Sequence, residues 1–223
     1  SYIIPTSYSI IDCTSHIPYI RKIKKGVFVD LKKSTYYNDG RYKNKSINRR
    51  NLMKRKTCCV TGHRDIATDE TAHVKDALRR EIEKAVNDGF TVFLSGFADG
   101  VDQYFAEIVL ELQNKNQDLK LIAVLPYRKR IDSLCQKEHT NALLDACAEV
   151  VVIREEYRPN AYSQRNRYMV EHSDRVIAVY DGREKGGTVK AIRFAHQFRK
   201  ELREIPIGLI LDRNRTNLGQ NQE

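Results

Sequence analysis

The sequence predicts a doubly wound α/β fold, in which a mostly parallel sheet of about six strands carries helices on both faces. Short apolar runs rich in β-branched residues, such as Phe90–Leu94 and Val150–Ile153, alternate with longer segments whose apolar residues recur at helical spacing. Strands that are apolar along their whole length are typical of a parallel sheet that is buried on both faces. The repeated order of strand and then helix favours the same architecture.

The expected elements follow one another through most of the chain. Strands are expected at 57–61, 90–94, 119–125, 150–153, 175–180 and 205–211, and helices at 69–87, 101–113, 131–147, 160–172 and 188–202. Gly89 ends the first helix, and Pro126 marks the turn before the helix at 131–147. The arrangement is Rossmann-like, and in such sheets ligands bind outside the carboxyl ends of the strands. We therefore expect the functional residues in the loops that follow strands.

Charge divides the chain into two unequal parts. Residues 1–56 carry 14 Lys and Arg against 3 Asp and Glu, whereas the rest of the chain carries 25 against 26. A basic protein suggests a nucleic-acid partner, and this inference therefore applies to the N-terminal segment alone. We expect a disordered or non-native basic leader over 1–52, a folded domain over 53–212 and a polar tail over 213–223. A basic arm that contacts phosphates or an anionic membrane is the functional alternative for the leader.

The five cysteines show neither C-x-x-C spacing nor the regular spacing of a disulfide framework. Cys58 and Cys59 are adjacent in an expected strand, where neighbouring side chains point to opposite faces, so we expect buried thiols and no shared metal. The sequence contains no run of about 20 apolar residues, which a membrane helix needs, and no secretory signal. We expect a cytoplasmic protein with no membrane partner, no metal and no required cofactor.

The first loop after a strand covers residues 61–64. Gly62 lets the backbone approach a ligand closely, and His63 and Arg64 offer hydrogen-bond donors to a phosphate or ribose. The alternative is that Arg64 pairs with Asp65 or Asp102 and only fixes the loop. The candidate ligand contacts in this loop are Thr61, Gly62, His63 and Arg64.

The second loop, 95–102, reads Ser-Gly-Phe-Ala-Asp-Gly-Val-Asp. Glycines near both ends, a serine hydroxyl and a following helix N-terminus describe a nest of backbone N–H groups for an anion. The loop lacks the G-x-G-x-x-G pattern, which disfavours an ordinary NAD-dependent dehydrogenase. The candidate contacts here are Ser95, Gly96, Gly100 and Asp102, although Asp102 alternatively only caps or complements the helix dipole.

The third loop, 181–188, contains Gly186, Gly187 and Thr188 at the expected start of a helix. Unpaired N–H groups and a hydroxyl at a helix N-terminus are suited to an anionic group. Because the three loops follow three parallel strands of one sheet, we expect them at the same edge. The sequence therefore predicts one anion-binding site built from all three.

These three loops, together with the run Gln-Arg-Asn-Arg-Tyr-Met-Val-Glu-His-Ser-Asp at 164–174, resemble the SLOG superfamily of Rossmann-like proteins. The resemblance covers residues 56–211 and is strongest to its YpsA-like branch of uncharacterised bacterial proteins. The superfamily also holds the DNA-processing protein DprA and the Lonely-guy (LOG) phosphoribohydrolases. The resemblance implies that the domain at 53–212 has a pocket for a nucleotide or an ADP-ribose-like derivative.

The resemblance also assigns roles to single residues. Arg165 falls where LOG enzymes place a catalytic arginine in a Q-R-x-x-x-M run, so it is the candidate catalytic residue and a candidate ligand contact. The LOG catalytic glutamate falls on Ala191, and without a carboxylate the oxocarbenium-like transition state of N-glycosidic cleavage loses its partner. Glu171 and Asp181 are the substitutes that the sequence offers.

We expect, on these grounds, a cytoplasmic protein that binds or senses a small nucleotide-like ligand. A LOG-like nucleotide phosphoribohydrolase is one alternative. A DprA-like single-stranded DNA-binding protein is another, which the nearly neutral domain disfavours, because sequence-independent DNA affinity comes mostly from neutralised phosphates. By analogy with other Rossmann-like proteins, we also keep open a homodimer that forms through helix faces.

Overall fold

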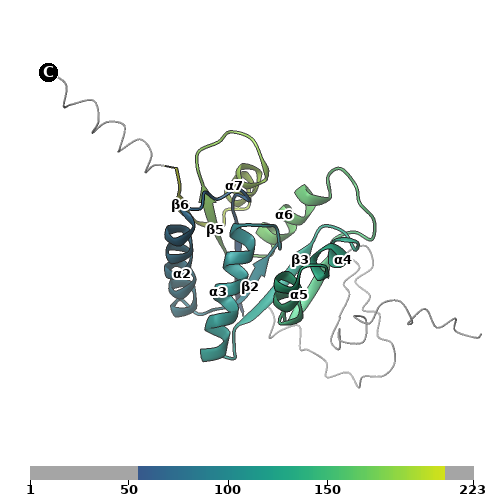
Figure 1. Ribbon diagram of the computed structural model, residues 1–223. Coiled ribbons are helices and arrows are strands. Elements are labelled where there is room, and N and C mark those ends of the chain that lie inside the picture. The colour runs from purple at the N-terminus through teal and green to yellow at the C-terminus, as the bar shows by residue number, and fades with distance from the viewer. Residues whose placement is uncertain (1–54, 209–223) are drawn as a thin grey trace, which may run out of the picture.

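The computed structural model describes residues 55–208, which form a three-layer α/β domain (Figure 1). The strands are β1 (Lys56–Thr61), β2 (Phe90–Ser95), β3 (Lys120–Leu125), β4 (Glu149–Val152), β5 (Arg175–Tyr180) and β6 (Glu201–Pro206). The helices are α2 (Thr71–Asn87), α3 (Val101–Lys115), α4 (Arg130–Cys135), α5 (Glu138–Asp145), α6 (Ala161–Glu171) and α7 (Gly187–Gln197). The expected leader at 1–52 and tail at 213–223 lie outside the described residues.

The strand order is β4-β3-β2-β1-β5-β6, and every neighbouring pair is parallel. The predicted α/β fold is therefore confirmed. The chain builds the sheet outward from β1 to β4 and then crosses back to place β5 on the other side of β1. This reversal between β1 and β5 is the topological switch point, and it creates a crevice at the carboxyl ends of the two strands.

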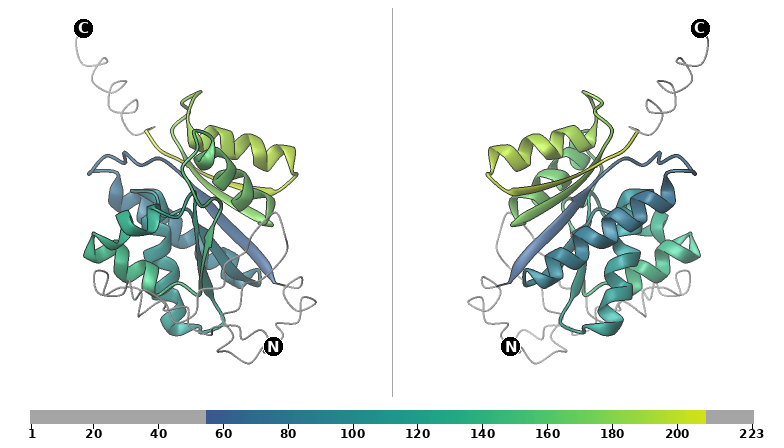
Figure 2. Two further views of the ribbon diagram at one scale, coloured as in Figure 1. Left: turned by 90° about the vertical axis from the view of Figure 1, so that its right-hand side faces the viewer. Right: turned by 90° about the vertical axis from the view of Figure 1, so that its left-hand side faces the viewer.

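Helices cover both faces of the sheet, with α2, α3, α4 and α5 on one side and α6 and α7 on the other (Figure 2). Adjacent residues of β1 enter different cores, as predicted. Cys58 packs in the cluster that includes Leu78 and Phe105, whereas Cys59 packs in the cluster that includes Met169. Burial raises the pKa of the Cys59 thiol to about 12, so this thiol is neutral.

The prediction of one continuous helix at 131–147 is wrong, because the structure has two helices there, α4 and α5. Lys137 adopts an extended conformation, with φ −103° and ψ 121°, and interrupts the helical backbone. The hydroxyl of Thr140 donates to the backbone carbonyl of Leu134 across the break. No glycine or proline marks this position, so the sequence pattern predicts one continuous helix.

The boundary expected between the last helix and strand is also wrong. Helix α7 ends at Gln197 rather than at residue 202, and β6 begins at Glu201 rather than at residue 205. Arg199 has φ +52°, which turns the chain after the helix. Nε of the buried Arg175 then lies 3.0 Å from a carboxylate oxygen of Glu201 and ties β6 to β5. Because β6 is a largely exposed edge strand, its polar sequence hides it from pattern analysis.

None of the helices within residues 55–208 is both long enough and apolar enough to cross a membrane.

The packing of α2 on the sheet generates a prediction. Leu78 is fully buried in the core, so Leu78→Ala should lower the free energy of unfolding by about 2–5 kcal/mol. Arg80→Ala, an exposed position two residues further along the same helix, should change it by less than about 0.5 kcal/mol. Urea denaturation of both variants checks this. Equal losses would contradict the assigned orientation of α2.

Candidate functional site

A pocket of about 250 Å³ lies at the switch point, over the carboxyl ends of β1 and β5. It draws its lining from the loops after β1, β2 and β5, the start of α3, the middle of α6 and the first turns of α7. The predicted site residues that line it are Thr61, Gly62, His63, Arg64, Asp102, Arg165, Gly186, Gly187 and Thr188. The three loops singled out in the sequence therefore meet at one pocket, as expected, and α6 adds a further wall.

Ser95, Gly96 and Gly100 are predicted site residues that do not line the pocket. They shape the loop beneath it instead. The hydroxyl of Ser95 donates to the backbone carbonyl of Asp102 at 2.8 Å. Gly100 has φ +77°, and a Cβ there would lie 2.7 Å from the carbonyl oxygen of Arg64, so only glycine fits between the two loops.

A buried ion pair joins α3 to α6 at the pocket. Nη1 of Arg165 donates to Oδ2 of Asp102 at 3.1 Å, and both residues are 5% exposed. The same Oδ2 accepts a hydrogen bond from the backbone N–H of Ala98 at 3.2 Å. Gly96 makes this arrangement sterically feasible, because a Cβ at that position would lie 1.0 Å from Nη1 of Arg165. Asp102 therefore fixes a buried cation and organises the loop before its helix.

Arg165 keeps unused hydrogen-bonding capacity at the pocket wall. Its Nε is buried and has no hydrogen-bond partner within residues 55–208, while its Nη1 is taken by Asp102. Buried polar groups in proteins are normally satisfied, and an unsatisfied charged donor is costly. A cation held in this way favours an anionic group in the pocket.

The N-terminus of α7 forms another wall of the pocket. Gly186, Gly187 and Thr188 all line it, and no side chain caps the helix. The first backbone N–H groups of a helix have no partner within the helix, and its dipole places partial positive charge there. Asn166 of α6 donates from Nδ2 to the backbone carbonyl of Gly187 at 3.3 Å and so links the start of α7 to α6.

Cationic side chains outnumber carboxylates around the pocket. Arg64, Arg165, Arg183 and Lys185 line it together with only Asp65 and Asp102. Arg183 lies 3.3 Å from Asp65, so the alternative in which Arg64 pairs with Asp65 or Asp102 is not what the structure shows. Arg64 instead stands over the ring of Tyr162, 5.4 Å from its centre.

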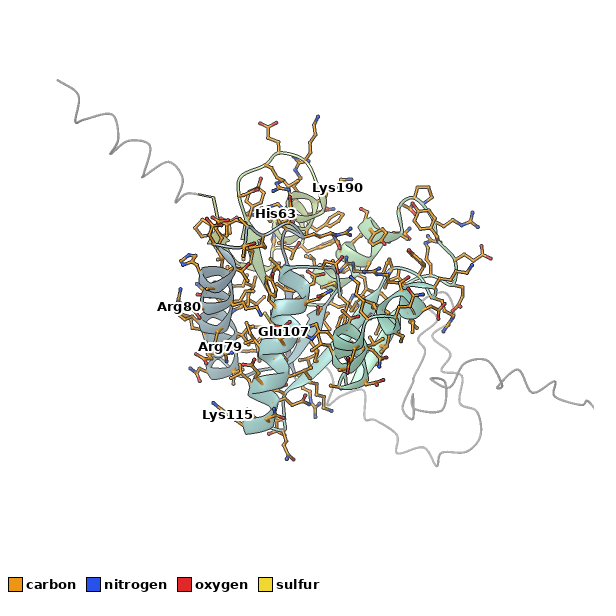
Figure 3. The ribbon with its side chains drawn as sticks, viewed as in Figure 1. His63, Arg79, Arg80, Glu107, Lys115 and Lys190 are labelled. Atoms are coloured by element: carbon orange, nitrogen blue, oxygen red, sulfur yellow. The ribbon has the colours of Figure 1, made fainter. Side chains whose placement is uncertain are left out.

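His63 ties the loop after β1 to the loop after β5. Its Nε2 lies 2.9 Å from Oδ1 of Asp181, and its ring stacks on Tyr180 with centroids 5.9 Å apart. Burial lowers the pKa of His63 and outweighs the attraction of Asp181. Burial opposes the lowering of the pKa of Asp181, but hydrogen bonds from Arg183 prevail. Figure 3 shows His63 at the end of the molecule where α7 begins, far from Lys115 at the end of α3.

No carboxylate stands where the LOG pattern places its glutamate. Ala191, which is 1% exposed, lines the pocket at that position. The substitutes expected from the sequence lie outside the pocket lining. Glu171 is 3.8 Å from Nε of Arg167 near the end of α6, and Asp181 is engaged by His63 and Arg183.

Sequence reasoning missed several residues of the pocket. Arg183 and Lys185 belong to the third loop, where cationic side chains next to the glycines are the signal that would identify them. Met169 is part of the Q-R-x-x-x-M run, where its buried side chain forms a wall. The remaining missed residues are Val60, Asp65, Ala98, Asn166 and Val170. Ala191, noted only as the position of the missing glutamate, also forms part of the pocket wall. Helical spacing could have found Met169, four residues after Arg165, and it also relates Asn166 to Val170.

Comparisons with known proteins cover the part of the chain that holds the pocket. The model of the YspA SLOG family matches residues 58–212, a range that contains every residue of the pocket. YoqJ, an uncharacterized SPbeta prophage-derived protein of Bacillus subtilis (strain 168), is 29% identical over 137 residues, which are 55% of this chain and 80% of YoqJ. A UPF0398 protein of Bacillus thuringiensis (strain Al Hakam) is 33% identical over 124 residues, 53% of this chain and 66% of that relative.

Among solved structures, DNA processing protein A from Helicobacter pylori, studied for its single-stranded DNA binding mode, shares the fold. The TM-score is 0.51 at 20% sequence identity, with 77% of this chain and 76% of that chain covered.

The buried ion pair generates a prediction about stability. Asp102→Ala leaves Arg165 as an uncompensated buried charge, so it should lower the free energy of unfolding by about 3–5 kcal/mol. Asp99→Ala removes the same charge from the same loop at an exposed position, and should cost less than about 1 kcal/mol. Urea denaturation of the two variants measures both losses in the free energy of unfolding. A mild effect of Asp102→Ala would show that the pair is not structurally important.

His63 generates a prediction about pH. Its folded-state pKa lies below the ordinary value of about 6.5, so the unfolded chain binds a proton more readily. The free energy of unfolding should therefore fall as the pH drops from 7.5 through about 6.5 to 5.5. Carboxylates with a lowered pKa, such as Asp181, change protonation below about pH 4, outside this window. His63→Gln should reduce the fall, and an unchanged fall would assign it to other groups.

Proposed function

The chain belongs to the YspA SLOG family, and we propose that its pocket binds a phosphorylated, nucleotide-type ligand. One observation carries the proposal: the uncapped N-terminus of α7 faces the same pocket as the buried cation Arg165. Helix N-termini and arginines are the two groups that proteins use most directly for phosphate. Their meeting at the switch point of a doubly wound sheet supports a phosphate site at the position where such folds bind ligands.

The preformed geometry supports tight binding of the phosphate. Asp102 and the backbone around Gly96 hold the Arg165 side chain before any ligand arrives. Ordering a flexible side chain on binding would otherwise reduce the affinity. Lys185, an exposed cation of the pocket lining, lies beside Gly186 and adds long-range attraction for the negatively charged ligand.

Ligand binding without turnover is the function that the lining favours. Cleavage of an N-glycosidic bond proceeds through an oxocarbenium-like transition state that needs a nearby carboxylate. Ala191 occupies the corresponding wall, and Asp102 is committed to Arg165. We therefore favour a binding or sensing role over a LOG-like hydrolase, with Arg165 as the candidate catalytic residue of that alternative.

Single-stranded DNA is the second candidate ligand, and the distribution of charge favours it. The exposed cations Arg64 and Lys185 at the pocket are followed by the exposed Lys190 and Arg193 on α7, a helix without acidic residues. Exposed cations on the helix that contributes its N-terminus to a phosphate site suit a polyanionic strand. The DNA processing protein A noted above has the same fold, which agrees with this candidate without deciding it.

Substitutions at the rim test the proposed site without disturbing the core. Arg64→Ala and Lys185→Ala should each weaken binding of AMP or ADP-ribose about tenfold, because each removes a charge-assisted contact. Arg167→Ala is the matched control, because this exposed arginine of α6 does not line the pocket, and it should leave the affinity unchanged. Isothermal titration calorimetry measures the affinity of the unaltered protein and of the three variants. Equal affinities across the set would place the ligand elsewhere.

A parallel titration with a short single-stranded oligonucleotide separates the two candidates. A nucleotide-binding protein should bind AMP or ADP-ribose more tightly than the oligonucleotide at 150 mM salt. A DNA-binding protein should show the reverse order, with an oligonucleotide affinity that falls steeply as salt increases. That reverse order would overturn the proposal in favour of the second candidate.

A further inference from the structure

Three tyrosines gather at the carboxyl edge of the sheet, next to the pocket but outside its lining. Tyr127 follows β3, Tyr157 lies in the loop after β4, and Tyr162 lies in the first turn of α6. The ring of Tyr127 meets the rings of Tyr157 and Tyr162 edge to face, with centroids 5.4 Å and 6.1 Å away. We call these residues the tyrosine cluster. Among the large hydrophobic side chains of residues 55–208, Tyr157 stands out as exposed, with 59% of its surface accessible.

The tyrosine cluster is connected to the phosphate site by α6. Tyr162 precedes Arg165 by three residues and Asn166 by four, so the three side chains share one face of the helix. Arg165 and Asn166 line the pocket. Tyr162 therefore stands one helical turn, about 5.4 Å along the axis, from the residues of the phosphate site.

Arg64 bridges the remaining gap between the two places. Its side chain lines the pocket, and its guanidinium also stands over the ring of Tyr162 at 5.4 Å from the centre. A planar cation beside a half-buried aromatic ring and an exposed one is a surface on which nucleobases stack, because every base offers a π-face. The loop after β1 thus supplies a contact to both ends of an elongated ligand.

The size of the pocket argues for a ligand that extends beyond it. Pockets that enclose a whole drug-sized molecule measure about 300–1,000 Å³. The volume of about 250 Å³ found here suits the phosphate and sugar, and leaves a base outside the enclosed space. Arg64 is the lining residue that also contacts the tyrosine cluster, through the ring of Tyr162.

From this geometry we infer that the tyrosine cluster and Arg64 form a stacking site for a nucleobase, the base of a nucleoside phosphate whose phosphate lies at α7 and Arg165. The inference rests on the proposed function and narrows it, because it requires a base rather than a sugar phosphate alone. It assigns recognition of the base to Tyr162, with Tyr127 holding the ring of Tyr162 in place and Tyr157 extending the surface.

The test compares AMP with ribose 5-phosphate, which lacks the base, by isothermal titration calorimetry on the full chain. The unaltered protein should bind AMP at least about tenfold more tightly, the effect of one stacked base. Tyr162→Ala should remove this preference and leave the affinity for ribose 5-phosphate unchanged. Tyr162→Phe, which keeps the aromatic ring, should retain the preference. Tyr157→Ala, a substitution at an exposed position, should reduce it and gives a second readout independent of α6.

The absence of tryptophan from the sequence adds a spectroscopic measurement. Tyr162→Trp places a single indole in the tyrosine cluster, and its fluorescence should be quenched by AMP but not by ribose 5-phosphate. Equal affinities for the two ligands, unchanged by Tyr162→Ala, would overturn the stacking site and leave the phosphate site intact. Binding of neither ligand would instead overturn the proposed function, and the stacking site with it.

Discussion

The pocket depends on the buried ion pair between Asp102 and Arg165. This pair is the point at which the two helical layers meet around the end of the sheet, since Asp102 begins α3 on one face and Arg165 belongs to α6 on the other. A paired charge in the interior holds its geometry, because separating the partners leaves one charge without compensation. Gly96 belongs to the same constraint, since any larger residue would occupy the space of the guanidinium. The cation is therefore in place before a ligand binds.

The fold could be predicted from the sequence almost completely, because buried parallel strands and amphipathic helices leave strong patterns. The two errors occur where tertiary contacts override local pattern. The break between α4 and α5 at Lys137 carries no glycine or proline. The early start of β6 at Glu201 reflects its pairing with Arg175 of β5, a tertiary contact that sequence periodicity does not reveal.

The position of the candidate site could be predicted from the sequence, but not which of its residues line the pocket and which only shape the loops. The rule that ligands bind at strand carboxyl ends places all three loops at one edge, and the pocket lies there. The sequence could not separate Thr188, which lines the pocket, from Ser95 and Gly100, which shape the loop beneath it. That distinction depends on which side of a loop faces the cavity. Nor could it reveal that Arg64 turns toward Tyr162, because the two residues are far apart along the chain.

The measurement that most directly tests the phosphate site is a heteronuclear NMR titration of the isotope-labelled chain with AMP. The account predicts that the largest chemical-shift changes occur at the backbone amides of Gly187 and Thr188 and at the Nε–H of Arg165, the donors that face the pocket or lack a partner. Changes confined to surfaces away from the pocket, such as the outer face of α2 and α3, would contradict it.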